Sequence, residues 1–177
     1  MSSLRRITEG PGYQAGTFAL VAAVAAILGA YFFEYVVKLA PCHLCLQQRL
    51  AYYAGIPALF IALVVLAAGQ RKAAALLFFA VAVAFLANTG LAVYHAGVEW
   101  QFWPGPDTCT QAPGHLQPLG GGSILDKLKE TRVIRCDVAA WRFLGLSLAG
   151  WNVIASFVIF VACLKAAFGS VAPRDRL

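Results

Sequence analysis

Long uncharged apolar runs alternate with short polar segments along this chain. No charged residue occurs between Glu9 and Glu34, and about 20 apolar residues cross the bilayer core as a helix. The pattern predicts four membrane spans, over about residues 16–33, 50–69, 73–94 and 143–164. The predicted fold is an all-α membrane protein, a single transmembrane domain over residues 1–177 that forms an antiparallel four-helix bundle.

The first span has a competing interpretation as a cleaved signal peptide. Ala23-Val24-Ala25 resembles a cleavage site. The apolar segment before it is short, however, and the run continues unbroken past it. We therefore expect a retained first helix.

Two polar segments fall on the same side of a four-span protein, residues 34–49 and residues 95–142. The longer one is rich in proline and glycine, including Gly120-Gly121-Gly122, which break regular elements. It is predicted to be a long flexible loop between the third and fourth helices. Within it, residues 123–132 fit either a helix on the bilayer surface or one packed on top of the bundle.

Composition excludes a soluble protein, because 60% of the residues are hydrophobic, 12% are charged and mean hydropathy is +0.72. A net charge of +6 could suggest nucleic-acid binding. The basic residues lie at the ends of apolar runs, where membrane topology explains them, so no nucleic acid is expected. Arg5-Arg6 and the Arg71-Lys72 turn favour cytoplasmic termini.

The candidate chemistry begins with Pro41-Cys42-His43-Leu44-Cys45, followed by Arg49. A helix that starts at Pro41, with proline in the first helical position, would put the two thiols on one face at a spacing that permits a disulfide. A helix N-terminus lowers a thiol pKa. Since Arg49 adds positive charge one turn beyond Cys45, Cys45 is predicted to be the more stabilised thiolate.

Other interpretations of these residues remain open at this point. The pair could be a structural disulfide or half of a metal site. His43 and His95 could each assist the chemistry or lie at the membrane interface. Cys109 and Cys136 occupy the long loop on the same side as Cys42 and Cys45, and disulfides persist outside the cytosol.

These features together resemble the bacterial disulfide bond formation protein B (DsbB) family. The resemblance rests on Pro41-Cys42-x-x-Cys45-x-x-x-Arg49, on Tyr94-His95, on Cys109, and on Cys136-Asp137 with the Trp141 to Trp151 segment that follows. It covers nearly the whole chain, from the first span to the fourth. Gln48 stands where relatives have an acidic residue before the arginine.

The resemblance implies a quinone-dependent protein disulfide oxidoreductase of the bacterial inner membrane, with cytoplasmic termini and periplasmic cysteine loops. A reduced DsbA-like periplasmic protein would attack a Cys109–Cys136 disulfide and form a mixed disulfide with Cys109. Electrons would then pass to the Cys42–Cys45 pair and on to a membrane quinone, ubiquinone or menaquinone, near Arg49 and His95. No metal is expected.

Three other functions compete. A disulfide-stapled four-span scaffold protein would not require the Cys42, Cys45 and Arg49 arrangement. A metal carrier would use Cys42, Cys45, His43 and either His95 or His115, but it leaves Cys109 and Cys136 unexplained. A quinone reductase of the vitamin K epoxide reductase type also combines such a pair with loop cysteines. The motif order of this chain fits that type less well, because Cys42 and Cys45 precede the loop cysteines.

Overall fold

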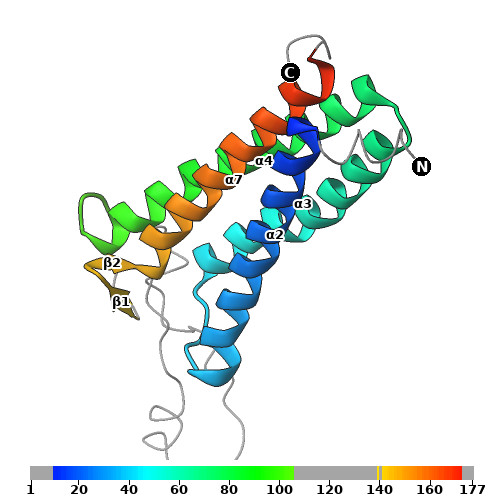
Figure 1. The fold of residues 1–177 in the computed structure, drawn as a ribbon. Coiled ribbons are helices and arrows are strands. Elements are labelled where there is room, and N and C mark those ends of the chain that lie inside the picture. Colours follow the sequence, from blue (N-terminus) through cyan, green and yellow to red (C-terminus); the bar gives the residue numbers. More distant parts are fainter. Residues whose placement is uncertain (1–9, 106–138, 140, 173–177) are drawn as a thin grey trace, which may run out of the picture.

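The computed structural model describes residues 10–105, 139 and 141–172, which form four long helices (Figure 1). They are α2 (Pro11–Tyr31), which continues into the π-helix η1 (Phe32–Val36), α3 (His43–Ala67), α4 (Arg71–Glu99) and α7 (Leu148–Val171). Each is long and apolar enough to cross a membrane. The predicted all-α membrane fold with four transmembrane helices is confirmed. Most of the predicted long loop lies outside the described residues.

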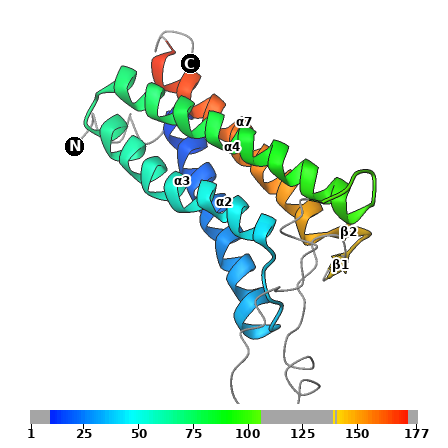
Figure 2. The ribbon, with the colours of Figure 1, turned by 180° about the vertical axis from the view of Figure 1, so that it is seen from behind.

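The four helices form a ring in which α2 and α4 each contact both α3 and α7. Figures 1 and 2 show from opposite sides that α4 and α7 run side by side. The start of α2, the turn between α3 and α4, and the end of α7 meet at one end of the bundle. There Arg71 Nε donates a hydrogen bond of 2.7 Å to the carbonyl of Ser170. The start of α3, the end of α4 and the start of α7 lie at the opposite end.

The fourth helix begins at Leu148, later than the span predicted from residue 143. Before it, β1 (Arg142–Phe143) and β2 (Leu146–Ser147) pair as a short antiparallel hairpin. Its turn residues, Leu144 and Gly145, have φ of 52° and 82°, which a helix cannot accommodate. Ser147 then caps the helix, because its Oγ accepts a hydrogen bond of 3.1 Å from Gly150 N. Hydropathy alone does not reveal this turn.

The core combines large aromatic side chains with very small residues. Phe78 and Phe85 are fully buried, and Cys163 is fully buried among apolar neighbours in the main core cluster. The closest helix approach is between Gly12 of α2 and the last turns of α7. A Cβ on Gly12 would lie 2.7 Å from the backbone nitrogen of Ser170. Only glycine permits this contact between backbones.

Replacing Gly12 with alanine is therefore expected to destabilise the protein by about 1–3 kcal/mol, the usual cost of overpacking. The matched control is Gly90→Ala, because a Cβ on Gly90 meets no atom within 4 Å. This change should stabilise α4 by up to about 1 kcal/mol through helix propensity. Unfolding of the two variants in the same detergent would show opposite shifts. Equal behaviour would contradict the close approach of α2 and α7.

Candidate functional site

The cysteine pair lies at the first turn of α3. The helix begins at His43, and Cys42 is its N-cap residue with extended backbone angles. The prediction that the helix starts at Pro41 is thus wrong by two residues. The Cys42 thiol itself performs the capping, since its Sγ accepts a hydrogen bond of 3.2 Å from Cys45 N. This bond requires Cys42 to stay extended, so the helix cannot include Pro41.

The two thiols are free and close together. Cys42 Sγ donates to Cys45 Sγ across 2.8 Å, and a disulfide bond measures about 2.05 Å. Less than an ångström of sulfur movement therefore separates the dithiol from the closed pair. Cys42 is buried, and Cys45 is partly exposed. The hydrogen bond to Cys45 and burial together raise the pKa of the Cys42 thiol.

This difference predicts which thiol reacts first with an alkylating agent. In the reduced protein at pH 7, Cys45 should be modified about tenfold faster than Cys42 or more, because only thiolate reacts and Cys42 retains its proton. Brief exposure to iodoacetamide, followed by proteolysis and mass spectrometry, measures the ratio. Replacing Cys109 and Cys136 with serine removes competing thiols. Preferential modification of Cys42 would contradict the assignment.

His95 is brought to the cysteine pair from α4. Its ring is buried, and its Nε2 lies 3.6 Å from Cys42 Sγ. Gln48 Nε2 donates a hydrogen bond of 2.9 Å to His95 Nδ1. The orientation of that amide is set by Asn152, whose Nδ2 donates to Gln48 Oε1. In the neutral ring Nδ1 is then the acceptor, and the proton resides on Nε2, facing the sulfur.

Arg49 lies one turn beyond Cys45 and has a partner that the sequence pattern does not reveal. Its Nη1 forms an ion pair with Glu34 Oε2, and its guanidinium lies 5.4 Å from the centre of the Tyr31 ring. Glu34 belongs to η1, and π-helical turns inside helices occur frequently at functional sites. The extra residue in this turn changes the direction in which Glu34 projects. The charge of Arg49 is therefore paired with a carboxylate.

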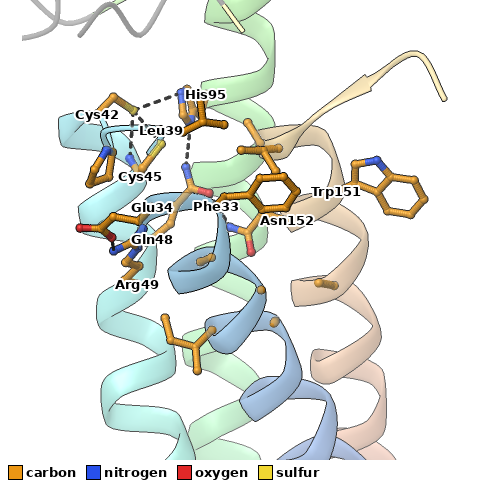
Figure 3. Close-up of a pocket in the computed structure, with 18 of the residues that line it drawn as sticks. Phe33, Glu34, Leu39, Cys42, Cys45, Gln48, Arg49, His95, Trp151 and Asn152 are labelled. Carbon is orange, nitrogen blue, oxygen red and sulfur yellow. Dashed lines mark hydrogen bonds and ion pairs between the residues drawn. The ribbon is translucent and has the colours of Figure 1, made fainter. Parts of the chain in front are cut away.

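An apolar cavity of about 290 Å³ opens between the helices beside these groups (Figure 3). Its apolar wall includes Ala26, Ile27, Ala30, Phe33 and Leu39. The polar groups at its edge are the following: Glu34, Cys42, Cys45, Gln48, Arg49, His95, Glu99 and Asn152. All four long helices or their immediate ends contribute. The cavity therefore offers a flat apolar ligand a lining of lipid-like character with a few hydrogen-bonding groups.

Three ligand atoms of a kind that soft metal ions prefer lie within 4.8 Å of one another, on Cys42, Cys45 and His95. The histidine nitrogen that faces the sulfur atoms is Nε2, and the hydrogen bond from Gln48 leaves the proton on that nitrogen. A metal-binding imidazole needs this nitrogen unprotonated. The arrangement therefore suits hydrogen-bond donation to sulfur better than metal coordination.

The structure unites four of the six predicted site residues, Cys42, Cys45, Arg49 and His95, around one cavity. Cys109 and Cys136 lie outside the described residues, and their roles stay predictions. His43 is exposed on the helix start. Sequence reasoning missed Glu34, Gln48, Glu99 and Asn152. Their only signal is polarity inside or beside a membrane span, which is costly and typical of functional positions.

Comparison with known proteins now supplies the family. The model of the family described as "Disulfide bond formation protein DsbB" matches residues 14–166. The chain belongs to the DsbB family. Among its relatives, the disulfide bond formation protein B of Hahella chejuensis is 29% identical, over 79% of this chain and 84% of that protein. That of Shewanella sp. strain MR-4 is 31% identical, over 80% and 79%. No solved structure matches the chain.

Membership of the family decides between the function classes that the sequence left open. The chain is a disulfide bond formation protein, a multi-pass membrane disulfide oxidoreductase. This identification excludes a purely structural scaffold and accounts for a reactive cysteine pair beside a helix N-terminus. It also places the chain in DsbB rather than among vitamin K epoxide reductases or metal carriers.

Proposed function

We propose that the chain reoxidises a reduced, thioredoxin-like periplasmic protein of the DsbA type and passes the two electrons to a membrane quinone. One observation carries this proposal. The Cys42–Cys45 pair borders an apolar cavity between membrane-spanning helices, with the Arg49 guanidinium in its wall. A lipid-soluble electron acceptor suits such a cavity, because its apolar walls lie between membrane-spanning helices.

The cavity suits a quinone ring in size and chemistry. A cavity of about 150 Å³ holds benzene, so 290 Å³ accommodates a substituted six-membered ring. Apolar side chains would cover the ring faces, and Arg49 offers N–H donors for a quinone oxygen. Ligand sites of this kind combine apolar walls with few polar groups that set orientation.

Redox energetics favour the same acceptor. A DsbA-type protein has a potential near −120 mV, well above the glutathione pools at about −200 mV and below. Only a more oxidising couple can withdraw electrons from it spontaneously. A quinone bound in the bundle supplies a two-electron acceptor of this kind.

The cysteines and Arg49 have different roles in this electron transfer. Cys109 and Cys136, by resemblance to the family, exchange disulfides with the partner and pass electrons to Cys42 and Cys45. Cys45 faces the acceptor, because Arg49 follows it by one turn of α3. Arg49 orients the quinone and stabilises negative charge that develops on its oxygen.

The proposed location is the bacterial inner membrane, with cytoplasmic termini and the cysteine-bearing end in the periplasm. The positive charges of Arg5-Arg6 and Arg71-Lys72 support this orientation. Pro11, Arg71 and Val171 all begin or end helices at the bundle end opposite the cysteine pair. Disulfide chemistry at the other end then takes place in an oxidising compartment.

The test uses the purified chain in lipid nanodiscs, a reduced DsbA-type protein, and ubiquinone or menaquinone analogues added separately. Quinone absorbance should fall as partner thiols disappear, two thiols for each quinone. Partner oxidation that proceeds without quinone reduction would refute the quinone part while leaving disulfide exchange intact. The faster of the two analogues identifies the acceptor class.

A further inference from the structure

Glu99, the last residue of α4, is a buried carboxyl group with no part in the proposed electron transfer. The residue is 9% exposed and lines the same cavity as the cysteine pair. Its Oε2 is the one buried side-chain oxygen or nitrogen atom without a hydrogen-bond partner in the described part of the chain. Buried polar atoms are nearly always paired, so an unpaired one needs an explanation.

The two carboxyl groups of the cavity differ in their partners. Glu34 is held by the Arg49 guanidinium, so its negative charge is compensated where it lies. Glu99 has no lysine or arginine within ion-pair distance among the described residues. Its titratable neighbour is His95, whose Nε2 lies 3.8 Å from Oε1. Glu99 can therefore change its protonation without breaking an ion pair with a fixed cation.

His95 links Glu99 to the cysteine pair. Its Nε2 proton, fixed there by Gln48, lies between two acceptors, Cys42 Sγ at 3.6 Å and Glu99 Oε1 at 3.8 Å. An ionised Glu99 attracts this proton. A protonated Glu99 leaves it to the sulfur, where it stabilises a thiolate. The protonation of Glu99 thus decides which acceptor the imidazole serves.

From this geometry we infer that Glu99 takes up the proton that Cys42 loses when the dithiol is oxidised. The exchange converts the Cys42 thiol and the Glu99 carboxylate into a Cys42 thiolate, hydrogen-bonded to His95, and a Glu99 carboxylic acid. The number of protons and the net charge of the site stay constant. Glu99 acts through His95, so it is a positioning and proton-holding residue.

The inference rests on the proposed function for the destination of the proton. One sulfur–sulfur bond forms between Cys42 and Cys45, two electrons pass to the quinone, and its oxygens take two protons. One proton comes from Glu99, which borders the cavity, and the other, originally from Cys45, comes through solvent. Cys42 needs such help because it is buried and next to the other sulfur.

Other groups also face Glu99. Arg142 of β1 acts on it electrostatically, and Ser147 of β2 is a polar neighbour. Cys45 of α3 is electrostatically coupled to it, and Cys42 and His95 complete the set. Removal of Cys45 therefore leaves Cys42 and His95 as the thiol and the imidazole that face Glu99.

The test measures alkylation of Cys42 against pH in the full-length chain without quinone. The parent protein carries Cys45→Ala, Cys109→Ser and Cys136→Ser, and modification of the Cys42 peptide is followed by mass spectrometry. Because no electron transfer is involved, failure of this test and failure of the quinone proposal are distinguishable. Glu99→Gln removes the proton acceptor at nearly constant shape, and Glu99→Asp retains a carboxyl group.

A proton shared by two groups gives a titration in two steps. The parent should therefore show a plateau of slow alkylation at low pH and a second rise at high pH. Glu99→Gln should show one rise, with alkylation about tenfold slower than the parent near pH 6 and equal or faster above pH 9. Glu99→Asp should restore two steps. In a His95→Asn background, Glu99→Gln should change the profile little.

Three outcomes would overturn the inference. Superimposable single-step profiles for the parent and Glu99→Gln would mean that Glu99 does not exchange protons with Cys42. Faster alkylation of Glu99→Gln at every pH would mean that Glu99 is only a repelling charge. An effect of Glu99→Gln that persists unchanged without His95 would refute the link through the imidazole.

Discussion

The Cys45→Ala variant is expected to lose quinone reduction by about a thousandfold or more, since removal of a covalent reaction partner leaves no alternative route. Cys42 Sγ lies 2.8 Å from Cys45 Sγ and has no other cysteine beside it in the described residues. Without Cys45 the pair cannot close. Stopped-flow absorbance of the quinone, with reduced partner in excess, measures the loss.

Cys163→Ala is the matched control for this variant. It also exchanges a cysteine for alanine within a membrane-spanning helix, but Cys163 is buried in the core away from the cavity. Its turnover should stay within about twofold, with a stability cost of a kcal/mol or so from the lost sulfur. If Cys45→Ala retained more than a tenth of wild-type turnover, the pair would not be the obligatory route for electrons.

A further measurement separates the two cysteine pairs. In Cys45→Ala the predicted mixed disulfide between Cys109 and the partner should still form, because that exchange precedes the step at α3. Non-reducing electrophoresis would show it as a covalent complex. Loss of the complex together with turnover would indicate that Cys45→Ala damages the fold rather than the chemistry.

The large features of this protein follow from its sequence because they depend on local pattern. Four apolar runs predict four helices, because a single segment in lipid can form all its backbone hydrogen bonds internally only as a helix. The motif Pro41 to Arg49 predicts a reactive pair at a helix start, because the helix N-terminus and the cysteine spacing act within one turn. Both predictions depend only on residues that lie a few positions apart in the sequence.

The hydrogen-bond network around the cysteine pair depends instead on contacts between residues that are distant in sequence. Gln48 meets His95 across 47 residues, and Asn152 meets Gln48 across 104. Hydropathy reports whether a position suits lipid, but it does not report which polar side chains share an interface. The ion pair of Glu34 with Arg49 could not be predicted either. A π-helical turn shifts the face on which the following residues lie, so the spacing of residues in the sequence no longer gives their direction.

The starts of α3 and α7 also differ from the sequence prediction, and for a local reason. Cys42 and Ser147 each cap a helix with a side-chain atom that accepts from the amide three residues later. A cysteine in this role is outside the usual set of capping residues, whereas proline at the first helical position is a familiar sequence signal. The error of two residues matters chemically, because it makes Cys42 the cap and Cys45 the residue inside the first turn.

Arg49→Ala is expected to raise the KM for quinone about tenfold to a hundredfold, the equivalent of one hydrogen bond from a charged donor at about 1.5–3 kcal/mol. Both cysteine pairs should still form disulfides. A simple loss of affinity would be ambiguous, however. The substitution also leaves the Glu34 carboxylate without its cation in a largely buried place, which could distort the cavity by itself.

A double-mutant cycle with Glu34→Gln resolves the ambiguity. If Arg49 serves only to neutralise Glu34, the double variant Arg49→Ala/Glu34→Gln should recover a near wild-type KM, because neither charge is left unpaired. If Arg49 binds the quinone, the double variant should remain as impaired as Arg49→Ala. Glu34→Gln alone should then lower the KM, since the guanidinium no longer has to leave a carboxylate to meet the quinone oxygen. Steady-state kinetics of the four proteins, with thermal unfolding as a check on folding, decide between these outcomes, and full recovery in the double variant would remove Arg49 from the acceptor site.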